Sequence, residues 1–461
     1  MAISSFLTSI SALISPSSRI LQDVNSLEFM ASMERWSSYG VKSPLAIVQP
    51  GNEQDIVYTV QEALRASIPF VAASGGHSPW SNIGPEGIVI DLSRYKGVTV
   101  DRDNNLAAVK GGTLMKELQV ALHPHKKFTA VGNGNTVGAI PYYLGGGISV
   151  YTPFTGFGSE NIVSAKLVNA KGELLEVSEA INSELLWALR GAGQFFGLVT
   201  ELTIKIYPYS LLGNDNGQRM CGTYIFLPHQ INEVCATLEK IMESKQHVSA
   251  GHFMIAQAPP NLKQKVLLLA PQVFCSADEA AKLFQPLVDL KPIQQMLVPS
   301  TFDTHSDHID WVCAKGDIKD FTQIGLAGWN TTNFKRLAEL HLDLIENCLD
   351  AARSVYTVEW HSPCRAERKF ESSFGHENVD YWLNILNWST NAENHAFITE
   401  MDQKAQAAMR VGTEQEAFVS YTNCTRDDPL EYRYKGVDRI AKLKNLKKHF
   451  DPDGVYTKQL L

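Results

Sequence analysis

The feature of this chain that most constrains its fold is the stretch Ser74-Gly75-Gly76-His77-Ser78. It ends an apolar, strand-like run that begins at Ile68, and the histidine follows the small residues at once. Small residues let backbone N–H groups approach a phosphate closely, in the concave arrangement called a nest. A histidine beside such a nest lies where a cofactor ring could sit. The alternative is an ordinary glycine turn in which neighbouring residues form hydrogen bonds with the histidine. The other motifs of the chain are needed to choose between a turn and a cofactor loop.

Size and composition limit the classes of function. The chain has 461 residues, of which 44% are hydrophobic and 20% are charged, so it can bury a large core in two domains or in one elaborated domain. The net charge of −8 argues against a nucleic-acid partner, which would require a basic face. No apolar run approaches the roughly 18 residues that a bilayer span needs. We therefore expect neither a nucleic-acid nor a membrane partner.

Cysteine usage bears on the compartment. Seven cysteines lie between Cys221 and Cys424 without a C-x-x-C pair, which is typical of free thiols in a reducing compartment. The N-terminus is mildly apolar, but serines interrupt it and no positive charge precedes it, so it is a poor signal peptide. The prediction is a cytoplasmic protein. Secretion is the alternative, because Asn330, Asn387 and Asn423 begin glycosylation triplets.

Short strands and helices alternate along the chain, which is typical of α+β or α/β proteins. The first 205 residues predict strands at 46–50, 70–73 and 87–92, and a helix at 53–66 with Asn52 as its N-cap. Beyond Pro208, the pattern predicts strands at 220–227, 252–256, 265–269 and 356–361, and helices at 230–244, 277–288 and 332–353. A last helix covers 436–450, and its lysines at 442, 444, 447 and 448 are predicted to form a solvated face.

Three further glycine clusters lie at 131–138, 144–148 and 189–201. The first and third read G-x-G-x-x-x-G rather than G-x-G-x-x-G, and neither sits in a clear βαβ frame, so they are not a Rossmann fingerprint. A single cluster is most simply a tight turn. Four clusters in the first 200 residues fit a long, phosphate-containing cofactor laid against the backbone.

These motifs together resemble the FAD-linked oxidases of the berberine-bridge-enzyme-like group, within the vanillyl-alcohol-oxidase superfamily. The resemblance runs from about Ser43 to about Ser210, and again from about Ala417 to the C-terminus. It rests on four ordered motifs, namely the flavin-attachment loop at 74–78, the next flavin segment at 144–147 with Phe157, Gly158 and Asn161, the flavin-edge motif at 187–200 and the closing motif at 450–456.

The resemblance implies a two-lobed α+β fold. An FAD-binding domain would occupy residues 1–208, with its PCMH-type part at about 40–208. A substrate-binding domain at 209–416 would carry an antiparallel sheet covered by helices. Residues 417–461 would return to the FAD domain.

The resemblance also implies FAD as the cofactor. His77 matches the histidine that bonds covalently to the flavin 8α-methyl group, and Ser74, Gly75, Gly76 and Ser78 would offer donors to the pyrophosphate. Many relatives carry a cysteine for a second flavin bond at the position of Gly134, so the link here is predicted to be single. The other residues expected to contact the cofactor are Gly134, Thr136, Gly138, Gly146, Gly147, Val199 and Asn423.

Two segments supply the expected catalytic residues. The stretch 418–424 resembles the family's Tyr-x-Asn-Tyr strand, which places Tyr421 over the flavin as general base or hydroxyl orienter, although Cys424 replaces the second tyrosine. A packed strand tyrosine is the alternative. Glu359 and His361 alternate on a predicted strand and share a face, which makes them a second acid/base pair unless they simply face solvent.

The stretch 303–310 is rich in aspartate and histidine, as metal sites are. It lacks the frame that positions metal ligands, and the family needs no metal, so we predict no metal site. A polar loop at the substrate mouth is the expected alternative.

The predicted function is that of a flavoprotein oxidase. A substrate carbon would lose a hydride to flavin N5, Tyr421 or a neighbour would take a proton, and O2 would reoxidise the flavin to give H2O2. Aromatic residues favour a hydrophobic small molecule of specialised metabolism, whose oxidation triggers ring closure in some relatives; they are Trp311, Trp329, Trp360, Phe374, Tyr381, Trp382 and Trp388. The alternatives are a non-redox cyclase or binding protein that keeps the scaffold, and a dehydrogenase that uses another electron acceptor.

Overall fold

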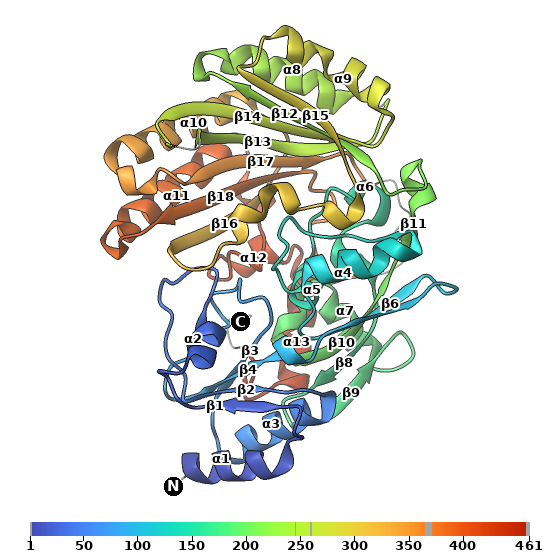
Figure 1. Ribbon diagram of the computed structural model, residues 1–461, viewed down its shortest axis with the longest axis vertical. Helices are drawn as coiled ribbons and strands as arrows, with labels where there is room; N and C mark the ends of the chain where they lie inside the picture. The colour runs from blue at the N-terminus through green and yellow to red at the C-terminus, as the bar shows by residue number, and fades with distance from the viewer. Residues whose placement is uncertain (1, 245, 259–260, 365–370, 458–461) are drawn as a thin grey trace.

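The protein has a mixed α+β fold, which confirms the predicted class. The computed structural model describes residues 2–244, 246–258, 261–364 and 371–457. Figure 1 shows a large sheet with its helices in the upper half of the molecule and smaller sheets in the lower half. The expected boundaries at 208 and 417 remain predictions. The large sheet contains the strands between residues 219 and 389 and also the short strand at 419–420, which lies beyond the second boundary.

The first small sheet has the strand order β1-β2-β4-β3. Its strands are β1 (Arg19–Leu21), β2 (Ala46–Gln49), β3 (Phe70–Ala73) and β4 (Ile88–Asp91), of which the last three are parallel. Helix α3 (Glu53–Arg65) connects β2 to β3, and the side chain of Asn52 accepts a hydrogen bond from the backbone N–H of Asp55, which confirms the predicted cap. Helix α1 (Ala2–Leu13) packs Phe6 and Ile10 into the core beneath this sheet. The Ser74–Ser78 loop therefore begins directly after β3, a strand that is fixed in the parallel part of this sheet.

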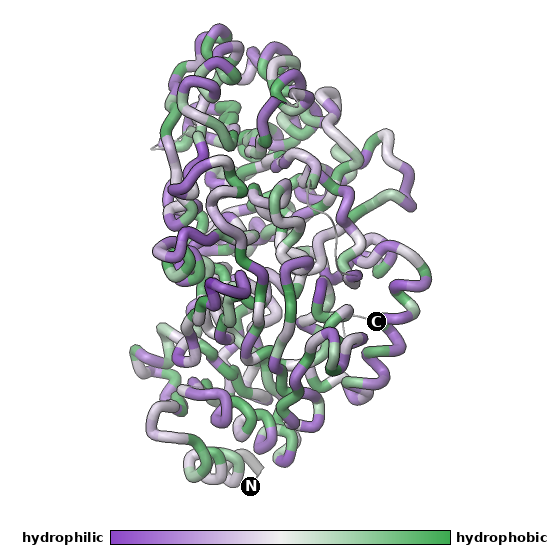
Figure 2. Tube along the Cα trace, turned by 90° about the vertical axis from the view of Figure 1, so that its right-hand side faces the viewer, coloured by the Kyte–Doolittle hydropathy of each residue, from purple (hydrophilic) through white to green (hydrophobic). Residues whose placement is uncertain are grey.

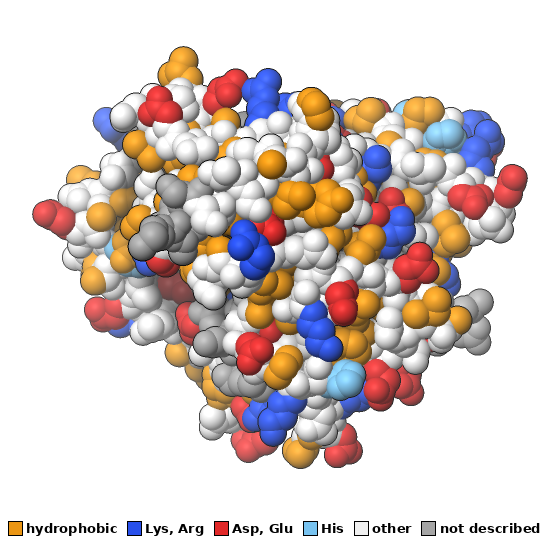
Figure 3. Space-filling view, turned by 90° about the horizontal axis from the view of Figure 1, so that it is seen from below, with side chains coloured by type: hydrophobic (Ala, Val, Ile, Leu, Met, Phe, Trp, Pro, Cys, Tyr) orange, Lys and Arg blue, Asp and Glu red, His pale blue; other side chains and the backbone are white. Residues whose placement is uncertain are grey.

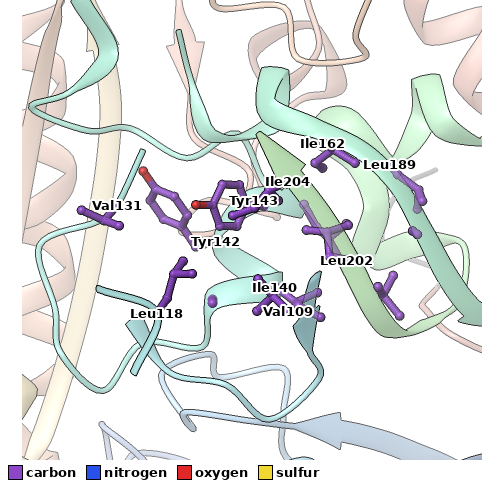
Figure 4. Close-up of a cluster of buried hydrophobic side chains, with 14 of the residues drawn as sticks. Val109, Leu118, Val131, Ile140, Tyr142, Tyr143, Ile162, Leu189, Leu202 and Ile204 are labelled. Carbon is purple, nitrogen blue, oxygen red and sulfur yellow. The ribbon is translucent and has the colours of Figure 1, made fainter. Parts of the chain in front are cut away.

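The second small sheet is antiparallel, with the order β5-β6-β10-β8-β9. Its strands are β5 (Val98–Asp101), β6 (Leu106–Lys110), β8 (Ile162–Val168), β9 (Leu174–Val177) and β10 (Leu198–Lys205). Helices α4 (Met115–Leu122), α5 (Ala139–Leu144) and α7 (Ser183–Ala192) share its hydrophobic core. Figure 4 shows Tyr142 and Tyr143 of α5 among apolar side chains of α4 and β10. This packing anchors the glycine segments on both sides of α5.

The large sheet is antiparallel, with the order β15-β12-β14-β13-β17-β18-β16-β19. Its strands are β12 (Arg219–Phe226), β13 (Ser249–Ala258), β14 (Gln264–Val273), β15 (Gln294–Ser300), β16 (Ile318–Leu326), β17 (Val355–His361), β18 (Tyr381–Ser389) and β19 (Val419–Ser420). One face packs against helices α8 (Ile231–Glu243), α9 (Ala277–Asp289), α10 (Thr331–Asn347) and α11 (His395–Met409). The other face looks toward the lower half of the molecule (Figure 1). Strands β15, β16 and β18 were not predicted.

The C-terminal helix α13 (Val437–Phe450) corrects one prediction. Lys444 and Lys448 are exposed, but Lys447 is buried and does not belong to a solvated face. Its Nζ donates to the carbonyl of Phe195 and to Asp451 Oδ2, each at 2.6 Å. The same carboxylate accepts backbone N–H bonds from Val455 and Tyr456, so one buried ion pair ties the closing motif to the flavin-edge motif.

The surface fits the composition. The Cα trace alternates between hydrophobic and hydrophilic residues along most elements, as expected where each element buries one face (Figure 2). On the face seen from below, lysine and arginine are interspersed with aspartate and glutamate (Figure 3). In the described residues, no helix is both long enough and apolar enough to cross a membrane.

Lys447→Met should lower the free energy of unfolding by about 3–5 kcal/mol, because it leaves the Asp451 carboxylate buried without its cation. Lys448→Met on the exposed side of the same helix is the matched control and should leave stability almost unchanged. Denaturant unfolding of the two variants is the measurement, and equal stabilities would show that the ion pair does not hold the C-terminal segment.

Candidate functional site

The centre of the site is a contact between two glycine loops. A Cβ atom at Gly75 would lie 2.1 Å from the carbonyl oxygen of Thr136, and one at Gly138 would lie 2.0 Å from Ser74 Oγ. Real Cβ atoms do not approach that closely, so only glycine lets these backbones touch. The structure thus brings together four residues that the sequence assigned to cofactor binding.

Both loops carry backbone donors without a protein partner. Within the described chain, the N–H groups of Gly75, Gly76, His77 and Ser78 donate to no other residue, and neither do those of residues 133–136. Gly76 has a φ of +71°, which turns successive amides toward one side. Unpaired backbone N–H groups in a concave loop are the donor set that a phosphate requires. The residues therefore fit a pyrophosphate-containing cofactor.

His77 is held in one orientation as a neutral imidazole. Its Nε2 forms a hydrogen bond of 2.7 Å with Thr136 Oγ1, and its ring stacks on Trp36 with centroids 6.0 Å apart. Burial, helped by the positive charges of Lys315 and Lys319, lowers the pKa of His77 to about 4. A neutral imidazole has a lone pair available for bonding to an electrophilic carbon.

Gly134 faces a thiol from a distant part of the chain. A Cβ at this position would lie 2.8 Å from Val137 Cγ2 and 3.5 Å from Cys313 Sγ. Cys313 is buried and lies at the end of the short helix Asp307–Cys313. A larger residue at Gly134 would therefore require Val137 to shift, whereas its distance from Cys313 Sγ would be an ordinary van der Waals contact.

The returning segment meets the second flavin segment. Tyr421 OH accepts a hydrogen bond from the N–H of Gly147 at 3.0 Å, and burial raises the pKa of the phenol. Asn423 packs against Gly145, donates to the carbonyl of Pro141 and accepts from Gln194. Burial also raises the pKa of the Cys424 thiol to about 12, so the residue at the second tyrosine position stays protonated.

Gly146 and Val199, two of the expected cofactor contacts, are surrounded by apolar side chains. Gly146 has a φ of +125°, and a Cβ there would lie 2.4 Å from the ring of Phe374. Val199 is buried in the core around β10 and pairs with Leu167 of β8. Gly146 thus belongs to the apolar wall beside Tyr421, and Val199 supports the sheet behind the site.

Glu359 is the carboxylate of the site. It is 3% exposed, which excludes the solvent-facing alternative. Its Oε1 accepts from Asn133 Nδ2 at 3.2 Å, and its Oε2 accepts from Asn384 Nδ2 at 2.8 Å. Asn133 lies in the glycine loop at 131–138, so this amide joins that loop directly to strand β17.

Two histidines complete this network. Asn133 Nδ2 lies 3.3 Å from His252 Nε2, and Asn133 Oδ1 lies 3.1 Å from His305 Nε2. Because the amide oxygen can only accept, His305 Nε2 carries the proton. Burial beside Arg219 lowers the pKa of His305 well below its usual value, so the ring is neutral.

The aspartate- and histidine-rich stretch 303–310 packs against the cofactor loop. Asp307 binds Lys116 and Asn135, and Ser306 donates to the carbonyl of Gly132. Among the described residues, no group of histidine, cysteine and acidic side chains could hold a metal ion. The stretch is a partly buried interface rather than an open loop.

His361 lies on the same face as Glu359 and is 3% exposed. Its Nδ1 donates to the carbonyl of Ser362 at 3.0 Å, and its ring packs edge-on against Phe157 with centroids 5.8 Å apart. Burial lowers the pKa of His361, so its Nε2 keeps a lone pair. The expected acid/base pair is therefore buried and contacts Asn133 and Phe157.

The predicted aromatic lining divides between the two faces of the large sheet. Trp329, Trp360 and Tyr381 belong to the helix-covered core and do not line the site. Phe374 and Trp382 cluster with Tyr421 on the opposite face of the sheet. Asn387 is 2% exposed, so its glycosylation triplet is inaccessible in the folded protein.

Sequence reasoning missed several polar residues of the site, namely Asn133, Asn384, His252 and His305. The alternation along β13 and β18 could have placed His252 and Asn384 on one face of their strands. No local pattern marks Asn133, because its role depends on strands that follow it by more than 100 residues.

Comparison with known proteins agrees with this geometry. Residues 44–178 match a family model described as an FAD binding domain. The chain is 29% identical over 456 residues to the FAD-linked oxidoreductase hasG of Aspergillus fumigatus, covering 92% of each protein. It shares its fold with BBE-like 1 of Physcomitrella patens, with a TM-score of 0.82, 18% identity and coverage of 98% of each chain. It also resembles the glucooligosaccharide oxidase of Acremonium strictum, described with a 6-S-cysteinyl, 8α-N1-histidyl FAD, with a TM-score of 0.79, 18% identity and coverage of 99% and 98%.

Asn133→Ala should destabilise the protein by about 1–3 kcal/mol, because it leaves Glu359 Oε1 and His305 Nε2 buried without a partner. Asn135→Ala in the same loop is the control. Asn135 donates to Asp307, a half-exposed carboxylate that Lys116 also binds, so its loss should cost less than about 1 kcal/mol. Equal unfolding midpoints for the two variants would show that the buried network contributes no stability.

Proposed function

We propose that the chain is an FAD-linked oxidase with the berberine-bridge-enzyme-like fold, which acts on a small molecule with FAD bound through His77. The observation that carries the proposal is the meeting of two loops with unpaired N–H groups beside a neutral histidine. The relatives support this reading, since they are named FAD-linked oxidoreductases.

In this proposal, the amides of 75–78 and 133–136 hold the FAD pyrophosphate, and Thr136 orients the His77 ring. Because Nε2 of His77 binds Thr136, Nδ1 is the nitrogen available to the flavin 8α-methyl group. FAD would supply the redox chemistry, accepting a hydride from a substrate carbon and passing two electrons to O2 to form H2O2. The protein supplies position and electrostatics.

If His77 alone carries the flavin, acid-precipitated protein should stay yellow, and His77→Ala should release the colour on the same treatment. Mass spectrometry of tryptic peptides should find FAD on the His77 peptide and an unmodified peptide containing Cys313. Flavin on both peptides would replace the single link by a double one, and a colourless pellet from the parent would remove the covalent bond from the proposal.

For proton removal, Glu359 is better suited than Tyr421. The phenol is protonated, accepts an N–H bond from Gly147 and has its pKa raised by burial, so it is a weak base. Glu359 is a carboxylate that faces the same region, and amide donors from Asn133 and Asn384 hold both of its oxygens in place. We therefore assign the base to Glu359 and an orienting role to Tyr421, with His361 beside them.

Glu359→Gln should slow flavin reduction by about 10²–10⁴, the usual contribution of a positioned base, without loss of FAD. Tyr421→Phe, which keeps the ring and removes only the hydroxyl, should slow it by less than about tenfold. Anaerobic stopped-flow with any compound that bleaches the flavin of the parent protein measures this step. The reverse order of the two effects would return the role of base to Tyr421.

Three alternatives differ in simple assays. A non-redox cyclase or binding protein would convert or bind its ligand without bleaching the flavin, whereas a dehydrogenase would bleach it but form no H2O2 in air.

The buried free thiols favour the cytoplasm over secretion; they are Cys235, Cys313 and Cys348. Intact mass from a native source would test this location.

A further inference from the structure

Arg426 is a largely desolvated cation without an anionic partner in the protein. Its Nε is buried, and within the described residues its guanidinium forms neither a hydrogen bond nor an ion pair. Asp427, next in the sequence, is exposed and acts on the guanidinium only through space. Burial lowers the pKa of Arg426 to about 10, so the group still carries its charge at neutral pH. Because a charge removed from water costs free energy unless an opposite charge compensates it, we expect the partner of Arg426 to lie outside the chain.

Two other partly desolvated arginines already have partners in the protein. Arg35, which lies beside Gly76, donates to three backbone carbonyls. Arg410 donates to Ser420 Oγ at 3.2 Å and to a backbone carbonyl. Each of these two guanidinium groups keeps one buried nitrogen without a partner, but the protein binds its other nitrogens. Arg426 differs because no nitrogen of its guanidinium is bound to a described residue.

Arg426 lies between the first glycine loop and the flavin-edge motif at 187–200. Its Cζ lies 4.1 Å from the ring centroid of Trp80 and 5.1 Å from that of Phe195, a residue of the flavin-edge motif. Trp80 follows the first glycine loop directly, and its backbone N–H donates to Ser78 Oγ at 3.2 Å. The two aromatic rings therefore hold the guanidinium beside the end of that loop.

The segment that carries Arg426 also contacts the chain beyond the second glycine loop. Asn423, three residues earlier, donates to the carbonyl of Pro141 at 3.1 Å. Pro141 lies three residues after Gly138, which is part of the close contact between the two loops. Residues 423–426 therefore extend from one loop to the other, across the backbone donors that we assign to the pyrophosphate.

The two glycine loops have no cation of their own. Residues 74–78 and 133–138 contain no lysine or arginine, and the low pKa of His77 keeps its ring neutral. A pyrophosphate is a dianion, and backbone N–H groups offer it only partial positive charges. A guanidinium binds phosphate oxygens through two parallel, charge-assisted hydrogen bonds. The loops thus form an anion site without a cation, next to a cation without an anion.

We propose that Arg426 binds the pyrophosphate of FAD and closes the cofactor site from the C-terminal segment. The inference rests on the proposed FAD site and deepens it by adding a residue that lies outside every glycine motif. Helix α12 (Leu430–Arg433), which follows Arg426, lies between the large sheet and the lower half of the molecule (Figure 1). The bound cofactor would therefore tie this returning segment to the two loops.

The test combines two effects of opposite sign in the full-length His77→Ala protein, where flavin binding is reversible. Arg426→Met keeps a long side chain against Trp80 and removes the charge. It should raise the thermal unfolding midpoint of the flavin-free protein, because an uncompensated charge is no longer buried. It should weaken FAD binding about 10–100-fold, the value of one charge-assisted contact, and leave the binding of riboflavin, which has no phosphate, unchanged. A lower midpoint, an unchanged FAD affinity or an equal loss of riboflavin affinity would overturn the proposal.

Arg410→Met is the matched control. Arg410 stacks on Phe418 at 4.6 Å, much as Arg426 stacks on Trp80, but the protein itself binds its guanidinium. Its loss should lower the unfolding midpoint and leave FAD affinity unchanged. Arg426→Lys keeps the charge and should bind FAD more tightly than Arg426→Met does. Equal FAD affinities of these two Arg426 variants would show that the charge makes no contribution.

A second measurement separates this inference from the proposed function. In the parent chain, with His77 intact, Arg426→Met should lower the fraction of purified protein that carries flavin, which absorbance at the flavin band measures. A parent protein that is purified without flavin and takes up no added FAD contradicts the proposed FAD site. A parent that carries FAD, together with an Arg426→Met variant that carries as much, contradicts only the role of Arg426. Neither measurement depends on substrate oxidation.

Discussion

The close contact between Ser74–Gly75 and Thr136–Gly138 is the constraint on which the rest of the site depends. At that contact backbone meets backbone at distances that no Cβ permits, so two loops about 60 residues apart share one surface. The small sheet delivers the first loop through β3, and the core around α5 anchors the second. The unpaired amides of both loops and the His77–Thr136 hydrogen bond all follow from this approach. The absence of a Cβ atom at Gly75 and Gly138 therefore sets the relative position of the two loops.

The large sheet serves two different purposes on its two faces. Phe253, Tyr356 and Val358 pack into the helix-covered core, while His252, Thr357 and Glu359 alternate with them on the same strands. Apolar burial on one face stabilises the sheet, which allows the other face to hold polar groups that cost free energy. The Glu359 carboxylate is then fixed by two amides, one from each half of the molecule.

Burial assigns the protonation states around the site. It raises the pKa of Tyr421 and Cys424, which keeps both protonated, and lowers the pKa of His77, His305 and His361, which keeps them neutral. Desolvation disfavours the charged form of every one of these groups.

The sequence by itself determined the fold class, the strand and helix before the first glycine loop, the Asn52 cap and the resemblance to FAD-linked oxidoreductases, because these depend on local periodicity and on motifs that are contiguous in the chain. It also identified His77 as a candidate cofactor-binding residue and Glu359 and His361 as a candidate acid/base pair. It did not reveal that Lys447 is buried, that Cys313 lies beside Gly134, or that Asn133 binds Glu359. Those facts depend on which side chains meet across more than 100 residues of chain or on which face of a helix is covered. Only tertiary packing decides that, because hydrogen bonding and burial act on neighbours in space and not on neighbours in sequence.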